Sequence, residues 1–257
     1  MNKILSFAGG DGRMQWARRY IEQAGYQTAD FPAEAATHLI LPLPAFDKEG
    51  NVTRGPVFSQ LLSRVSPGMQ VFGGKLGEQG ELLAEKGCKV TDYFLDEGLT
   101  AENAAITAEG AVQLAMSSLP VTLRGSQALV IGWGRIGQLL CRYLSGLGCE
   151  VTATARKKRD LAMIEALGYT ADETGVYRKG LSRYRVIFNT VPAPVMDAKQ
   201  VAETWPDCLL VELSSGGKME NAAGRQMLLA GGLPGKTAPE TAGILIGKTI
   251  LRLLQEN

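Results

Sequence analysis

The chain has 257 residues, of which 45% are apolar and 21% charged, and its formal net charge at pH 7 is +1. This length suffices for one large or two modest domains, and the near-neutral charge gives no electrostatic reason to expect nucleic acid or an anionic membrane as a partner. Because no apolar run reaches the ~18 residues of a membrane span, and the four cysteines and single histidine lack metal-ligand spacing, we expect a cytoplasmic protein with reduced thiols and no metal site.

Strands and helices alternate in the first part of the chain. The expected strands cover residues 3–9, 38–44, 69–74 and 88–94, and the expected helices cover 13–24, 56–65 and 77–87. Strands that are separated by helices form parallel sheets covered on both faces. We therefore predict an α/β, flavodoxin-like domain over residues 1–98 that binds the substrate.

The second part repeats this alternation after a connecting helix at 99–118. The expected strands are 127–132, 149–154, 185–190 and 208–213, and the expected helices are 135–147, 157–167, 173–180, 197–203 and 219–226. We predict a Rossmann-like domain with a parallel sheet over 99–239, and we expect the amphipathic segment at about 240–257 to pack back on the first domain.

A glycine-rich turn follows the strand that begins the second alternation. The stretch LVIGWGRIGQLL places Gly132, Trp133, Gly134, Arg135 and Ile136 between an apolar strand and a helix. In such a turn the first glycine allows the bend, the second lets the backbone approach a pyrophosphate, and the third lets helix and strand pack. We expect these residues to bind a dinucleotide, and the alternative is a tight turn without a ligand.

The next strand indicates which dinucleotide binds. Sites for NAD usually place an acidic residue at this strand's exit to bond the ribose 2′-hydroxyl. This chain instead has Thr154, Arg156 and Lys157, which suit a 2′-phosphate and favour NADP, with NAD as the alternative. The basic run could also be the solvated start of a helix. Asn189, Thr190 and Pro192 follow a later strand, and we expect them to contact the cofactor.

Several stretches together resemble one family. The Rossmann half alone resembles the cofactor domains of D-2-hydroxyacid dehydrogenases and S-adenosylhomocysteine hydrolase. With LVIGWGRIG, the stretches GGDGR, LPLPAFDKEGNV, TAEGAVQLAM, NTVP, ELSSGG and GLPGKTAPETAG are similar, in this order, to the A-subunit family of dipicolinate synthase. They span nearly the whole chain.

The resemblance implies an NAD(P)-dependent oxidoreductase that works with a second, flavoprotein-like partner, similar to the B subunit of dipicolinate synthase. Its substrate would be a dihydrodipicolinate-type ring from a branch of the lysine (diaminopimelate) pathway. Its product would be dipicolinate, the calcium-chelating acid of bacterial endospores made in sporulation. A homodimer formed through the cofactor domain is a further expectation.

The residue inventory is consistent with this chemistry. A 2-hydroxyacid dehydrogenase usually needs a histidine–acid pair and an arginine, but the one histidine, His38, is predicted to be an ordinary strand residue. A dihydropyridine needs only a modest base, because aromatisation supplies driving force. We predict Glu109, on the connecting helix beside an interdomain cleft, as that base, and its alternative is a solvated carboxylate.

The doubly charged substrate needs cations, hydroxyls or backbone N–H groups. Arg13 begins a helix after a glycine-rich strand exit, and we predict it as a catalytic and substrate-binding anion site. Further candidates for substrate binding are Ser214, Ser215, Gly216 and Lys236. Each cation could equally be a surface charge.

Two other functions remain open from the sequence. One is another NADP-dependent dehydrogenase of small carboxylic acids, such as a 2-hydroxyacid enzyme. The other is a non-catalytic NADP-binding regulatory subunit, which would bind the nucleotide without turning over a substrate.

Overall fold

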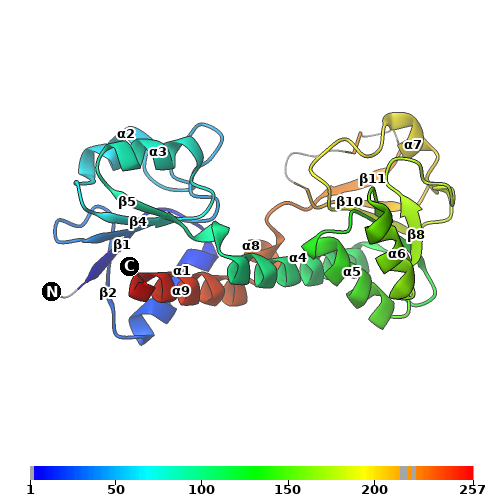
Figure 1. The fold of residues 1–257 in the computed structure, drawn as a ribbon, viewed down its shortest axis with the longest axis horizontal. Coiled ribbons are helices and arrows are strands. Elements are labelled where there is room, and N and C mark those ends of the chain that lie inside the picture. The colour runs from blue at the N-terminus through cyan, green and yellow to red at the C-terminus, as the bar shows by residue number, and fades with distance from the viewer. Residues whose placement is uncertain (1–2, 215–218, 221–223, 257) are drawn as a thin grey trace. The chain divides into compact units, whose positions relative to one another are not determined.

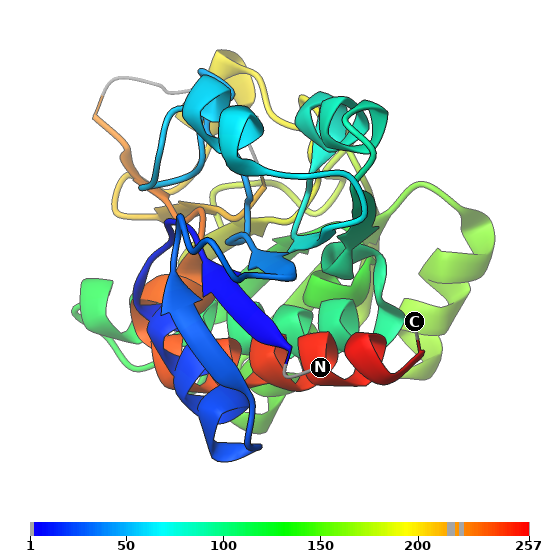
Figure 2. The same cartoon turned by 90° about the vertical axis from the view of Figure 1, so that its left-hand side faces the viewer.

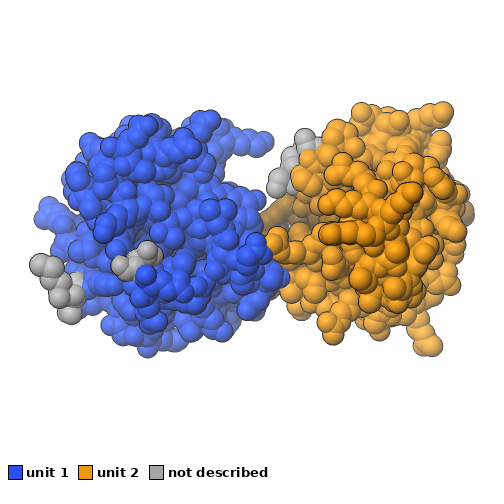
Figure 3. All heavy atoms as spheres, viewed as in Figure 1, with its two compact units in different colours: residues 1–103, 234–257 blue, residues 104–233 orange. Residues whose placement is uncertain are grey.

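A computed structural model describes residues 3–214, 219–220 and 224–256 of the chain. The chain folds into two compact units, one of residues 1–103 with 234–257 and the other of residues 104–233 (Figure 3). Each unit contains one parallel sheet, so the predicted α/β class with two parallel sheets is confirmed.

Unit 1 is built on a five-stranded sheet with the order β2-β1-β3-β4-β5. Its strands are β1 (Ile4–Phe7), β2 (Gln27–Asp30), β3 (His38–Ile40), β4 (Gln70–Gly73) and β5 (Lys89–Asp92). Helices α1 (Gly12–Gln23) and α9 (Pro239–Glu256) cover one face, and α2 (Phe58–Arg64) and α3 (Gly77–Glu85) cover the other (Figure 1). A short 3₁₀ helix, η1 (Tyr93–Leu95), follows β5. This strand order is the flavodoxin-like one.

The C-terminal helix α9 lies beside α1 within unit 1 (Figures 1 and 2). Glycines make this close approach necessary and feasible. A Cβ added at Gly243 would lie 2.3 Å from the carbonyl oxygen of Arg13, and one at Gly247 would lie 3.0 Å from that of Ala17. The pattern of small residues on α9 therefore attaches the end of the chain to the helix that follows β1.

Unit 2 has a six-stranded sheet with the order β11-β10-β9-β6-β7-β8. Its strands are β6 (Gln127–Ile131), β7 (Glu150–Ala155), β8 (Thr170–Glu173), β9 (Val186–Asn189), β10 (Leu209–Glu212) and β11 (Gln226–Leu229). Its helices include α5 (Arg135–Gly146), α6 (Lys158–Ala166) and α7 (Ala198–Ala202). Numbered within the unit, this is the Rossmann strand order 3-2-1-4-5-6.

Two helices span the boundaries between the units. Helix α4 (Glu97–Ser118) begins two residues before the predicted start at 99, and the boundary falls within it, between Asn103 and Ala104. The short helix α8 (Leu233–Thr237) contains the second boundary, between its first two residues.

Three predictions of secondary structure are wrong, and all three concern edge strands. Strand β8 and a turn replace the expected helix at 173–180, and β11 begins where the expected helix at 219–226 ends. Met219, at the start of that segment, forms a parallel bridge with Met196. Strand β2 was not anticipated. The sequences QTAD, TADE and QMLL are partly exposed, so they lack the continuous apolar runs of the central strands.

Candidate functional site

Each sheet has a point where the strand order reverses direction. In open α/β sheets, ligands bind beyond the carboxyl ends of the strands at this switch point. The switch point of unit 1 lies between β1 and β3, and that of unit 2 lies between β6 and β9. The predicted site residues are therefore best judged by their distance from these two places.

The glycine turn after β6 is shaped by close backbone contacts. Gly132 has a φ of 103°, and a Cβ there would lie 2.6 Å from Oγ1 of Thr190 on the neighbouring strand exit. A Cβ at Gly137 would lie 2.1 Å from the carbonyl oxygen of Gly132. Only glycine fits at both positions, because one needs a left-handed backbone and the other needs helix and turn in direct contact.

The middle glycine, Gly134, faces open space. It is the N-cap of α5, is exposed, and makes no side-chain cap, and a Cβ added there meets no heavy atom within 4 Å. A helix start without a side-chain cap has N–H groups and a positive dipole end available for an anion. The turn therefore fits a dinucleotide pyrophosphate.

The other residues of the turn lie on either side of it. Trp133 is half-buried and packs edge-on against Tyr169, with ring centroids 6.2 Å apart. Ile136 is also half-buried against the core, and Arg135 is exposed. The side chains of Trp133 and Ile136 thus support the turn, while Arg135 points to solvent.

The exit of β7 separates a buried hydroxyl from two exposed cations. Thr154 is fully buried, and its hydroxyl lies 2.8 Å from that of Thr174 and 3.4 Å from the N–H of Gly132. It therefore stabilises the glycine turn from behind. Arg156 and Lys157 are exposed directly after the strand, and the exit carries no acidic residue. This arrangement suits a 2′-phosphate better than a free ribose hydroxyl.

A buried carboxylate that sequence reasoning missed organises the exits of β9 and β10. Glu212 is 1% exposed, and Nδ2 of Asn189 donates to both of its oxygens at 3.0 Å. The backbone N–H and the hydroxyl of Ser214 donate to Oε1, and the N–H of Met219 donates to Oε2. A polar residue that ends the apolar run LLVE was the available signal.

These contacts change the roles expected for several residues. The side chain of Asn189 and the hydroxyl of Ser214 are used inside the protein, so they support the loop. The hydroxyl of Thr190 donates to the carbonyl oxygen of Ile131 at 2.9 Å, which ties the two strand exits at the switch point together. Pro192 is exposed just beyond them. Ser215 and Gly216 lie outside the described residues.

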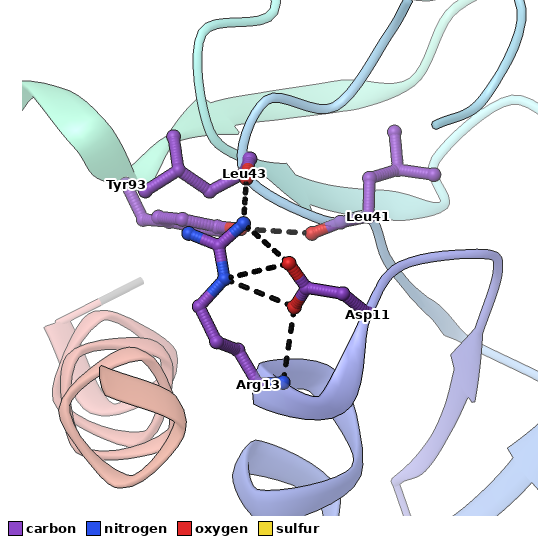
Figure 4. Close-up of polar contacts among 5 residues, drawn as sticks. All are labelled: Asp11, Arg13, Leu41, Leu43 and Tyr93. Atoms are coloured by element: carbon purple, nitrogen blue, oxygen red, sulfur yellow. Dashed lines mark hydrogen bonds and ion pairs between the residues drawn. The ribbon is translucent and has the colours of Figure 1, made fainter. Parts of the chain in front are cut away.

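Arg13 lies at the switch point of unit 1 in an ion pair with Asp11 (Figure 4). Nε of Arg13 donates to both carboxylate oxygens at 2.9 and 3.1 Å, and Nη2 donates to Oδ2 at 2.9 Å. Nη2 also donates to the carbonyl oxygen of Leu43, beyond β3. Burial alone would raise the pKa of Asp11, but the hydrogen bonds and charge of Arg13 outweigh it and hold that pKa below its usual value.

The start of α1 is therefore not the vacant anion site that the sequence suggested. Asp11 is the N-cap of α1 and accepts the N–H of Arg13, so the chain's own carboxylate fills that place. Nη1 of Arg13 makes no hydrogen bond to any residue that the structure describes, and Figure 4 shows it directed away from Asp11. One end of the guanidinium thus keeps its donors for a ligand.

Two neighbours complete this part of unit 1. Tyr93 donates its hydroxyl hydrogen to the carbonyl oxygen of Leu41 at 3.0 Å, and burial raises its pKa far above the ordinary value. Helix α8 reaches the ion pair, because a Cβ at Gly235 would lie 2.8 Å from Oδ2 of Asp11. Lys236, the next residue, is exposed. The structure therefore brings the α8 segment to Arg13.

The predicted base, Glu109, is not brought to either switch point. It is exposed on α4 and lines a hollow with Arg142, Tyr143 and Leu147. These residues belong to the C-terminal half of α5 and the residue that follows it, whereas the glycine turn precedes the other end of that helix. Its position gives no support to a role as proton acceptor.

Several side chains are poorly suited to nucleophilic or acid–base chemistry. His38 is buried, and burial lowers its pKa. Burial raises the pKa of Cys141 and of Cys208 to about 12. Among the described residues, no three His, Cys, Asp or Glu side chains gather to hold a metal, and no helix is long and apolar enough to cross a membrane.

Comparisons with known proteins agree with this geometry. Residues 99–235 match the family described as "D-isomer specific 2-hydroxyacid dehydrogenase, NAD binding domain". The A subunit of dipicolinate synthase from Bacillus subtilis (strain 168) is 30% identical over 241 residues, which is 88% of this chain and 80% of that protein.

Solved structures extend the likeness in fold. A crystal structure of the dipicolinate synthase A subunit from Bacillus halodurans has a TM-score of 0.86 at 22% identity and covers 99% of this chain and 98% of its own. That of the corresponding chain from Bacillus subtilis has a TM-score of 0.83 at 24% identity, with 100% and 97% covered. A transhydrogenase from Sinorhizobium meliloti has a TM-score of 0.75 at 14% identity, with 99% and 94% covered.

Proposed function

Because the chain belongs to the A-subunit family of dipicolinate synthase, we propose that it oxidises a dihydrodipicolinate-type ring to dipicolinate with NADP as the favoured cofactor. Its NAD binding domain makes it an oxidoreductase of the nicotinamide-dependent type. The observation that carries the proposal is the 30% identity to a dipicolinate synthase chain over 88% of this one.

The cofactor would be held by unit 2. A bound nicotinamide supplies a hydride acceptor for the ring. The uncapped start of α5 at Gly134 would bind the pyrophosphate, and Arg156 and Lys157 would bind the 2′-phosphate of NADP. Thr154, Thr190 and Glu212 would act by holding the strand exits around the cofactor in place.

The substrate would be recognised through unit 1. Nη1 of Arg13 would donate to one carboxylate of the ring, and Asp11 fixes the guanidinium by a two-point contact. Because Asp11 neutralises Arg13, net attraction for a dianion needs a further cation, and Lys236 at the adjoining α8 segment is suited to that role. The reaction removes a hydride and a proton from the ring. We assign the proton to no side chain and propose that water receives it.

The relative from Bacillus subtilis is one of the subunits of its synthase, and this motivates one more part of the proposal. We propose a partner similar to the B subunit of dipicolinate synthase, within a branch of the lysine pathway that supplies dipicolinate during sporulation. Turnover measured with and without that protein would show whether the chain acts alone.

The test mixes the purified chain with freshly generated dihydrodipicolinate and either NADP or NAD, with and without the partner protein. We expect the absorbances of reduced cofactor and of a pyridine dicarboxylate to rise together, faster with NADP. Cofactor reduction by 2-hydroxyacids instead, or nucleotide binding without turnover even with the partner, would overturn the proposal.

A matched pair of variants separates substrate binding from cofactor binding. Arg13→Lys keeps the charge but loses the planar two-point contact with Asp11, so the KM for the ring should rise about tenfold or more while nucleotide affinity stays unchanged. Arg19→Lys, on an exposed position of the same helix, should change neither quantity.

A further inference from the structure

One crossover of unit 1 lacks a helix and leaves a hollow over the sheet. Residues 31–37 connect β2 to β3 directly, whereas α1, α2 and α3 occupy the other connections between the strands. Beside α2, this leaves a cavity of about 460 Å³. That volume is typical of small-molecule sites.

The floor of the hollow contains a buried hydroxyl without a partner. The register pairs Ser6 of β1 with Leu39 of β3, so both side chains point to the same face of the sheet. Leu39 packs in the core beneath α2 and lines the hollow, and Ser6 lines it too. Ser6 is 1% exposed, and its hydroxyl bonds to no described residue. A buried hydroxyl in this state calls for a partner in the cavity.

The rim of the hollow carries two charges of opposite sign. Arg64 lies in the last turn of α2, and Glu34 lies on the connection between β2 and β3. Both are exposed, and neither forms an ion pair with a residue that the structure describes. Between rim and floor, the walls include the apolar side chains of Phe31, Leu39 and Met69.

From this arrangement we propose that the hollow binds an α-amino acid that has an apolar body and a hydrogen-bonding tip. Arg64 takes the carboxylate, Glu34 takes the ammonium group, the apolar walls take the body, and Ser6 bonds the tip. A ligand with a single charge would leave one rim charge unanswered.

This site is distinct from the one at Arg13. The hollow extends toward Thr37 and Met69, which precede β3 and β4, whereas Arg13 lies beyond the carboxyl ends of β1 and β3. Ligand binding and ring oxidation can therefore be tested separately.

Four related compounds test the proposal on the full chain by isothermal titration. Tyrosine carries all three features, phenylalanine lacks the tip, tyramine lacks the carboxylate, and 3-(4-hydroxyphenyl)propionate lacks the ammonium group. We expect tyrosine to bind about tenfold more tightly than each of the other three, because each lacks one hydrogen-bonding or charged group. Absence of tyrosine binding at millimolar concentration, or equal affinity for all four, would overturn the proposal.

Three substitutions assign each contact. Ser6→Ala should abolish the preference for tyrosine over phenylalanine, Arg64→Gln should weaken tyrosine but not tyramine, and Glu34→Gln should weaken tyrosine but not the propionate. Arg64 and Glu34 are exposed, so their variants keep the test valid if Ser6→Ala fails to fold. Arg64→Gln should leave ring oxidation unchanged, and affinities that ignore the substitutions would contradict the assignment.

Discussion

The two units each place a glycine-rich turn after the first strand of a sheet, but the helices that follow begin differently. After β1, Asp11 caps α1 and pairs with Arg13. After β6, Gly134 begins α5 without any side-chain cap. Both turns lie at a switch point, so their position in the fold is equivalent.

The difference shows that a glycine-rich strand exit does not by itself define an anion site. The positive end of α1 is already satisfied by a carboxylate of the chain, whereas the start of α5 has room for a phosphate. The N-cap residue decides which turn receives an external anion. In unit 1, the donor left for a ligand is a side chain, Arg13, held in place by that cap.

The largest effect is expected at the third glycine of the β6 turn. Gly137→Ala places a Cβ 2.1 Å from a backbone oxygen, which should lower the free energy of unfolding by about 3 kcal/mol or more and abolish nucleotide binding. Denaturant unfolding and NADPH fluorescence titration measure the two quantities.

Gly134→Ala is the matched control in the same turn. Its Cβ meets nothing within 4 Å, so stability should stay within about 0.5 kcal/mol of the wild type. The methyl group occupies the space expected for the pyrophosphate, so nucleotide affinity should still fall at least tenfold. Unchanged affinity in Gly134→Ala would contradict the role given to this turn.

The second largest effect is expected at the cap of unit 1. Asp11→Ala removes both the cap and the partner of Arg13, which should cost about 3 kcal/mol of unfolding free energy. Asp11→Asn keeps a capping side chain and should lose about 1 kcal/mol. Nucleotide affinity should be unchanged in both, since Asp11 lies in unit 1, and a large loss of NADPH binding would argue against separate roles for the two turns.

Much of this comparison follows from sequence, and the rest depends on contacts in three dimensions. The apolar runs of β6, β9 and β10 and the glycines around them predicted the Rossmann sheet, because strands buried on both faces need such runs. The exposed edge strands β2, β8 and β11 carry no such pattern.

The site was less predictable than the fold. The preference of aspartate for N-caps could have identified Asp11 as the cap of α1, and hence as a competitor for any external anion. The bonds of Glu212 to Asn189 and of Thr154 to Thr174 join residues about 20 positions apart. Nothing local in the sequence signals which polar side chains are used internally.

A smaller effect is expected at the exit of β7. Arg156→Gln removes an exposed guanidinium that we assign to the 2′-phosphate, so NADP affinity should fall about tenfold while NAD affinity stays constant. Parallel titrations with the two nucleotides measure the ratio. An equal loss for both would mean that Arg156 does not read the 2′-phosphate.

The smallest effect is a pH dependence of unit 1. The pKa of Asp11 is lower in the folded chain than in the unfolded one, so its stabilising contribution is complete above about pH 4 and is lost as the pH falls through the lowered value. The difference in unfolding free energy between the wild type and Asp11→Asn should therefore shrink below about pH 4. A difference that does not vary with pH would indicate that the ion pair contributes nothing.

The most direct test of the account is a crystal structure of the chain grown with NADP and dipicolinate. We predict the pyrophosphate against the backbone of residues 132–136, the 2′-phosphate beside Arg156, and a carboxylate of the ring bonded to Nη1 of Arg13. A nucleotide bound elsewhere, or an empty turn after β6 in crystals saturated with NADP, would contradict the account.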